Sequence, residues 1–255
     1  MKNRVFREEE LGEMGKRTVD LLTEAIEAGD KERAKKLANR MYREFSVIHD
    51  LYRDWLADMM DYVYRSHGED ELYRALRKTI GATLAPIANL EKADFRRRVE
   101  ALATILRGHL VALELQEDDE KVCIKMKPCS TGQRLLETGS YDPPRNLAMI
   151  EKPHVMTWGL ANFPVYCAHA PVMELLIMER LGWPVFVILP ETEVARQSCA
   201  YCLYKNAEDI PDEVFARLGK RKTDVAQAGK QVAFRKKQSV PGGGGGLSHR
   251  PGIQS

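Results

Sequence analysis

A chain of 255 residues, 44% of them hydrophobic, can bury the core of one large domain or of two smaller ones. Its N-terminus lacks a stretch that resembles a signal peptide, and its apolar runs are too short to cross a bilayer, which argues against membrane insertion and favours a cytoplasmic protein. The net charge of +2 is uneven, because eight Lys and Arg residues and one acidic residue follow Gly219. Five cysteines without regular spacing predict reduced thiols or metal ligands rather than structural disulfides in that compartment.

Residues 1–108 have the pattern of helices, rich in Ala, Leu, Met and charged side chains and nearly free of proline. The pattern predicts an antiparallel bundle of four helices, at residues 8–28, 30–68, 69–80 and 92–107. In the second helix, apolar residues recur at steps of three and four from Leu37 to Val63 and form one long stripe. A helix this long often packs against a second copy, so we expect a homo-oligomer through the N-terminal helices.

The periodicity changes at Gly108, and residues 109–219 have the pattern of an α+β domain. Residues 110–115 and 121–127 predict a hairpin whose second strand points Val122, Ile124 and Met126 inward. We expect further strands at residues 184–189 and 199–204, a short helix after Cys129 and an amphipathic helix at residues 172–181. The fold class is therefore α+β: a helical bundle followed by a mostly antiparallel sheet with covering helices.

Residues 220–255 are basic and contain a run of five glycines, which predicts a disordered tail. The basic groups of this tail could contact nucleic acid. They lack interleaved aromatic residues apart from Phe234, so we expect no nucleic-acid binding.

Cysteine and histidine residues concentrate in three short segments, at residues 128–134, 164–169 and 198–202. Zinc takes about four nitrogen and sulfur ligands in a tetrahedron. Cys129, Cys167, His169 and Cys199 could supply these ligands if the fold brings the three segments together. We therefore expect either a zinc site or a thiol-based site here.

The thiol-based alternative centres on Cys129, which follows a strand and precedes a predicted helix. The positive end of that helix would favour a thiolate. His154 or His169 could then act as the general base or as the partner cation, and Glu174 could orient the histidine or transfer a proton. In this alternative the catalytic residues are Cys129, His154 and Glu174.

Four other residues are expected to have no part in the site. Cys123 falls on the lysine-bearing face of its strand, and Cys202 shares a face with apolar neighbours. His49 lies five residues after Glu44, so the two are on different helix faces and the Glu-x-x-His pair of a di-iron bundle is absent. His109, at the junction of helix and strand, is expected to have a structural role.

The arrangement of Cys129, Cys167 and Cys199 with the aromatic Tyr201 resembles proteins of the L-2-amino-thiazoline-4-carboxylate hydrolase-like family. The resemblance covers roughly a third of the chain and does not reach the N-terminal helices. It implies the hydrolysis of a small heterocycle that contains sulfur and nitrogen, in the cytosol of a bacterium.

Two functions follow from these features. The first is a small-molecule hydrolase or lyase that uses the Cys/His site, with either zinc or an activated thiolate. The alternative is a ligand- or metal-binding sensor module without catalysis, which self-associates through its N-terminal helices.

Overall fold

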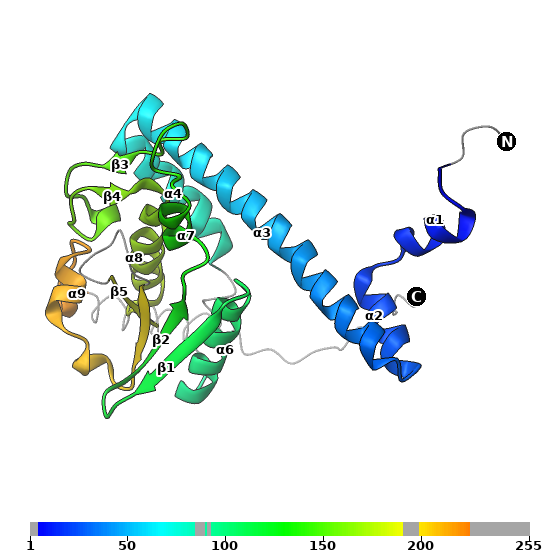
Figure 1. Cartoon of the computed structure of the whole chain (residues 1–255). Coiled ribbons are helices and arrows are strands. Elements are labelled where there is room, and N and C mark those ends of the chain that lie inside the picture. The colour runs from blue at the N-terminus through cyan, green and yellow to red at the C-terminus, as the bar shows by residue number, and fades with distance from the viewer. Residues whose placement is uncertain (1–4, 85–89, 91–92, 191–198, 225–255) are drawn as a thin grey trace, which may run out of the picture.

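The computed structural model describes residues 5–84, 90, 93–190 and 199–224, and its architecture is α+β, as the sequence predicts (Figure 1). Most of the predicted tail lies outside the described residues. The longer helices are α1 (Glu8–Gly15), α2 (Thr18–Glu27), α3 (Lys31–His67), α4 (Glu69–Thr83), α6 (Phe95–Arg107) and α8 (His169–Leu181). The short helices are α7 (Gly132–Glu137), α9 (Asp212–Ala216) and the 3-10 turns η2 (Val155–Thr157), η3 (Val165–Ala168) and η4 (Ala207–Asp209). The strands are β1 (Ala112–Glu117), β2 (Lys121–Lys127), β3 (Met149–Ile150), β4 (Phe163–Pro164), β5 (Val187–Leu189) and β6 (Ala200–Tyr204).

The long helix predicted from the apolar stripe is α3. Its first turn is capped by Asp30, whose side chain accepts a hydrogen bond from the backbone N–H of Arg33 at 3.0 Å. It ends where Gly68 adopts φ of 83°, a conformation that glycine tolerates without steric cost. The single helix expected at residues 8–28 is instead two helices, because the backbone is extended at Lys16 and Arg17.

The four-stranded sheet has the order β1-β2-β6-β5, and all its neighbouring strands are antiparallel. The alternation predicted for β2 is confirmed, since Val122, Ile124 and Met126 are buried. Opposite Ile124 on β6 lies Tyr201, which in turn pairs with Ile188 on β5. In Figure 1 the helices α4, α6 and α8 lie behind this sheet, and α9 lies beside the β5 edge.

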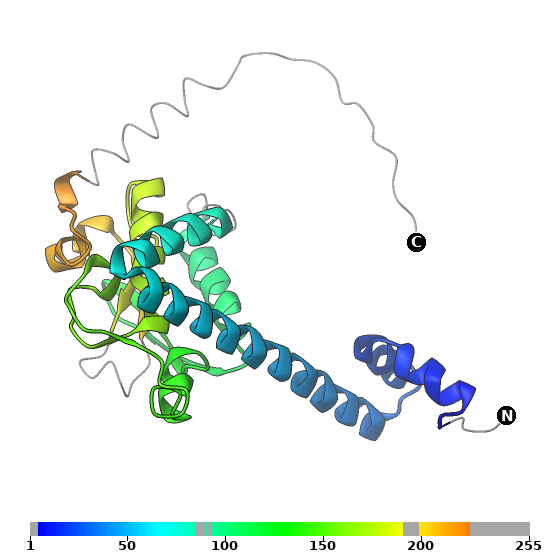
Figure 2. The same cartoon turned by 90° about the horizontal axis from the view of Figure 1, so that it is seen from above.

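One hydrophobic core extends from Ala57 in α3 to Leu218 and includes residues of α4 and α6. The boundary predicted at residue 108 therefore does not separate two cores: α4 packs on α8, and α6 packs on β1 and β2. A second, small cluster joins α2 to the first half of α3 through Leu21, Ala25 and Leu37. Seen from above, α3 extends well beyond the domain, with α1 and α2 at its far end (Figure 2).

Candidate functional site

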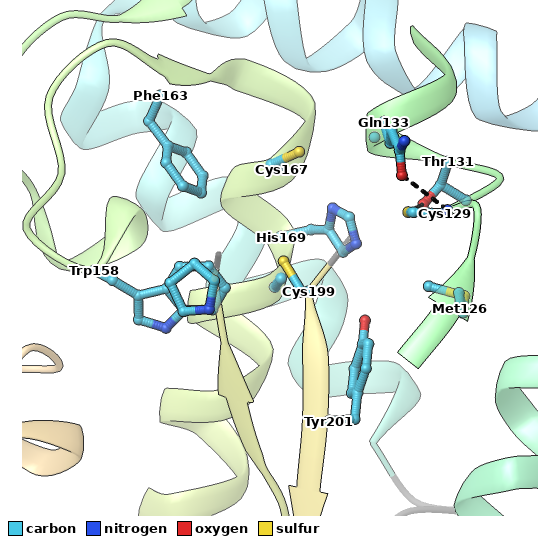
Figure 3. Close-up of a pocket in the computed structure, with 13 residues that line it drawn as sticks. Met126, Cys129, Thr131, Gln133, Trp158, Phe163, Cys167, His169, Cys199 and Tyr201 are labelled. Atoms are coloured by element: carbon cyan, nitrogen blue, oxygen red, sulfur yellow. Dashed lines mark hydrogen bonds between the residues drawn. The ribbon is translucent and has the colours of Figure 1, made fainter. Parts of the chain in front are cut away.

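A pocket opens where the turn before α7, the start of α8 and the ends of β5 and β6 meet (Figure 3). Cys129, Cys167, His169 and Cys199, the four residues predicted as ligands or reactive groups, all line it. Most of the remaining wall is apolar, and it includes the rings of Trp158, Phe163 and Tyr201. The space in which the centre of a water molecule fits is about 40 Å³, enough for a few waters or one small group of a ligand.

The turn that carries Cys129 is held from two sides. The backbone N–H of Cys129 donates to the side-chain oxygen of Gln133 at 3.2 Å, and the Sγ of Cys129 lies 3.2 Å from the hydroxyl of Thr131. On the other side, the buried guanidinium of Arg53 in α3 donates to the carbonyl of Ser130 at 3.3 Å. The long helix thus helps to position the residue that the sequence marks as the nucleophile.

Cys167 and Cys199 are held as neutral thiols. Burial raises the pKa of the Cys167 thiol well above its usual range, and it raises the pKa of Cys199 to about 12. The sulfur of Cys167 also packs against the backbone of Gly132, where a β-carbon would lie 2.5 Å from Sγ. Glycine is therefore the residue that lets α7 approach this wall of the pocket.

His169 is the first residue of α8, and its ring extends toward the Cys129 turn (Figure 3). Its Nδ1 lies 2.6 Å from the carbonyl oxygen of Tyr166. Because a carbonyl can only accept, Nδ1 carries the proton and Nε2 is left as the basic atom. Burial lowers the pKa of His169 below its usual value of 6.5, so the ring is neutral at pH 7 and able to accept a proton.

His154 does not line the pocket. It caps η2, where its Nδ1 accepts a hydrogen bond from the backbone N–H of Met156 at 3.1 Å. Its ring packs edge-on against Tyr73, with 5.1 Å between the ring centroids. These contacts assign His154 a local structural role and give no support to the predicted role in proton transfer.

Glu174 is fully buried and points to the edge of the sheet, not to His169. Its carboxylate accepts hydrogen bonds from the indole N–H of Trp158 at 2.7 Å, the backbone N–H of Ile188 at 3.1 Å and the guanidinium of Arg217 at 2.8 and 3.0 Å. Arg217 also donates to the carbonyl of Ile188 at 2.6 Å. Glu174 and Arg217 therefore satisfy the backbone N–H and the carbonyl of Ile188 on the outer side of β5. This is a structural role.

Cys123 and Cys202 form a disulfide, so the prediction that all the cysteines are reduced or metal-bound is wrong for these two. The residues lie directly opposite each other on β2 and β6, with Cα atoms 4.0 Å apart. Their exclusion from the predicted site agrees with this arrangement, because each sulfur is bonded to the other.

A second pocket of about 260 Å³, lined by both polar and apolar side chains, lies on the other side of the same turn. Within it, His49 Nε2 lies 3.1 Å from His109 Nδ1, and His49 Nδ1 lies 3.3 Å from a carboxylate oxygen of Asp50. The hydroxyl of Ser130, which also lines this pocket, is buried without a hydrogen-bond partner in the described part of the chain. No local sequence pattern predicts this pairing, because the two histidines are 60 residues apart.

Zinc is not supported by the positions of the side chains. Within the described ranges, no three His, Cys, Asp or Glu side chains lie close enough together to hold a metal ion. The donor set of Cys129, Cys167, His169 and Cys199 suits zinc chemically, so zinc binding stays a prediction.

No helix among the described residues is long and apolar enough to cross a membrane.

Comparisons with family models, with curated proteins and with solved structures find no match to this chain.

Proposed function

We propose that the protein is a small-molecule hydrolase or lyase in which the thiol of Cys129 attacks the substrate and His169 accepts its proton. The observation that carries this proposal is the convergence of Cys129, Cys167, His169 and Cys199 on one largely apolar pocket. A nucleophile, a base and an oriented second nitrogen on that base are the parts that thiol catalysis needs. Hydrolysis is the reaction class that the family resemblance implies.

The roles follow from the protonation states. Nε2 of His169 would take the proton of the Cys129 thiol as the sulfur bonds to an electrophilic carbon of the substrate. The same nitrogen would then deliver the proton to the leaving group, and water would release the product from the sulfur in a hydrolase. Cys167 and Cys199, neutral by burial, would line the wall without competing as nucleophiles.

The pocket also restricts the substrate. Its wall offers thiols, a neutral imidazole and aromatic rings, and its interior is small. We therefore propose a compact substrate whose reacting part is uncharged, such as a five-membered heterocycle containing sulfur and nitrogen.

Alkylation of the full chain by iodoacetamide, followed by mass spectrometry of each cysteine, tests the proposal. We expect Cys129 to react faster than Cys167 and Cys199, and we expect His169→Gln to slow the reaction at Cys129. Turnover of 2-amino-thiazoline-4-carboxylate and related heterocycles should be lost in Cys129→Ser and retained in Cys199→Ser. Equal labelling of all three residues in both proteins would contradict the thiol mechanism.

Zinc binding by Cys129, Cys167, His169 and Cys199 is the metal form of the same proposal. Elemental analysis of the purified protein, compared with Cys129→Ser and Cys167→Ser, tests it. About one zinc per chain, lost in both variants, would replace the thiol mechanism. A metal content near zero together with unchanged thiol reactivity in both variants would reject both forms.

The alternative is a sensor module that binds the same class of ligand without converting it. The largely apolar pocket favours binding as much as catalysis. Saturable binding of a heterocycle with no product formed would establish this alternative.

A further inference from the structure

The middle of α3 has two faces that differ in solvent exposure. The inner face packs on the domain: Ala57 and Met60 are buried in the core, and Arg53 reaches the Cys129 turn. The outer face is apolar but exposed. Its side chains are Met41, Tyr42, Phe45, Ile48, Leu51, Tyr52, Trp55, Leu56, Met59 and Tyr62, each at least 40% exposed.

Seven of these residues follow the spacing of a coiled coil. We define the α3 seam as Met41, Phe45, Ile48, Tyr52, Trp55, Met59 and Tyr62, which are 40–64% exposed. Successive members are separated by four and three residues in strict alternation, the a and d positions of three consecutive heptads. The stripe expected from the sequence between Leu37 and Val63 has steps of three and four without this strict alternation. Side chains in strict alternation interlock with those of a partner helix.

We propose that a second copy of this chain covers the α3 seam, with the two α3 helices packed antiparallel about a two-fold axis near Leu51 and Tyr52. The ten exposed apolar side chains of this face are 40–64% exposed and present roughly 1,000 Å² per copy. This is enough area for the ~800 Å² that each partner buries in a typical stable interface. Soluble monomers rarely leave a continuous apolar patch of this size exposed. The same patch on both copies satisfies the requirement of a two-fold interface.

The charges at the start of α3 and at the junction of α3 with α4 select the antiparallel orientation. Residues 31–44 carry six basic and two acidic side chains, a net charge of +4. A two-fold axis at the centre of the seam places them near residues 59–72 of the other copy, which are the last turns of α3 and the first turn of α4. Together these carry four acidic and one basic side chain, a net charge of −3. Parallel pairing would instead place +4 beside +4.

Sedimentation equilibrium of the full chain tests the association, and two neighbouring residues provide a matched pair of variants. Ile48 belongs to the seam, whereas Val47 lies off it and is 68% exposed. We expect the wild-type chain and Val47→Glu to sediment at 58 kDa, twice the 29.0 kDa of one chain. Ile48→Glu should raise the dissociation constant by about 100-fold or more, because each dimer would bury two unpaired carboxylates. Both side chains are exposed in one copy, so circular dichroism of each variant should match the wild type.

Cysteine cross-linking tests the orientation. In the antiparallel dimer Phe45 lies beside Met59 of the other copy, so the double variant Phe45→Cys/Met59→Cys should form a covalent dimer under mild oxidation. Phe45→Cys alone should not, and neither should the wild-type chain with its own cysteines. A wild-type chain that is monomeric at 100 µM, or equal dissociation by Val47→Glu and Ile48→Glu, would overturn the proposal. Cross-linking by Phe45→Cys alone would overturn the antiparallel arrangement.

Discussion

The contact between Gly132 and Cys167 makes the packing of the pocket wall testable. In Gly132→Ala the new β-carbon would lie 2.5 Å from Cys167 Sγ, roughly 1 Å closer than an ordinary van der Waals contact. The next atom, Cδ1 of Tyr166, lies at a comfortable 3.9 Å, so the sulfur is the whole obstacle. Overpacking of this kind costs about 1–3 kcal/mol of unfolding free energy.

Removing the sulfur should remove this cost. In the Cys167→Ala background we expect Gly132→Ala to be neutral, or stabilising by up to about 1 kcal/mol, because alanine favours helix more than glycine does. Urea denaturation followed by tryptophan fluorescence gives the four unfolding free energies of this double-mutant cycle. We expect a coupling energy of about 1–3 kcal/mol. If Gly132→Ala costs the same in both backgrounds, the two residues do not touch and the described wall of the pocket is wrong.

Three further predictions concern the scaffold around the pocket. The Cys123–Cys202 disulfide joins residues 79 apart in the sequence, for which the chain-entropy model gives an upper value of about 4.5 kcal/mol. We expect reduction to lower the unfolding free energy by about 2–4 kcal/mol, and the Cys123→Ser/Cys202→Ser variant to be insensitive to the reductant in the same urea titration. Glu174→Gln should cost about 2–4 kcal/mol, because it leaves a largely buried guanidinium without its counter-charge. Glu179→Gln, which alters two partly exposed ion pairs with Arg77 and Lys220, should cost less than about 1 kcal/mol in the same measurement. Burial and the neighbouring imidazole lower the pKa of His109 below 6.5, so the unfolded chain takes up a proton first as the pH falls. The contribution of His109 to the free energy of unfolding should therefore be complete above about pH 7 and decline below it. In denaturant titrations, His109→Gln should lose less of its unfolding free energy than the wild type between pH 7 and pH 5.

Features set by local periodicity could be predicted from the sequence. The bounds of α3 follow from Asp30, Gly68 and the apolar repeat between them, and the inward face of β2 follows from simple alternation. The convergence of Cys129, Cys167 and Cys199 could also be anticipated, because each lies at the end of a predicted element beside a turn. Loops at one end of a domain tend to meet.

Features set by strand register could not be predicted. Cys123 and Cys202 meet because β2 and β6 align them, and no local pattern encodes the register of strands so far apart in the sequence. Glu174 lies away from His169 for a different reason. Five residues along a helix correspond to a rotation of about 140°, so Glu174 and His169 point to different sides of α8. The sequence offset between them could have indicated this.

The helix α3 connects the two proposals through opposite faces. Its inner face positions the Cys129 turn through Arg53, whose guanidinium also binds Asp50 at 3.0 Å and Asp54 at 2.9 Å on the same helix. These contacts lie within one chain and do not need a partner. A substitution at Ile48, on the outer face, can therefore dissociate the dimer while Arg53 still holds the turn. Labelling of Cys129 and association through the seam thus report on separate properties, and failure of one proposal leaves the other standing.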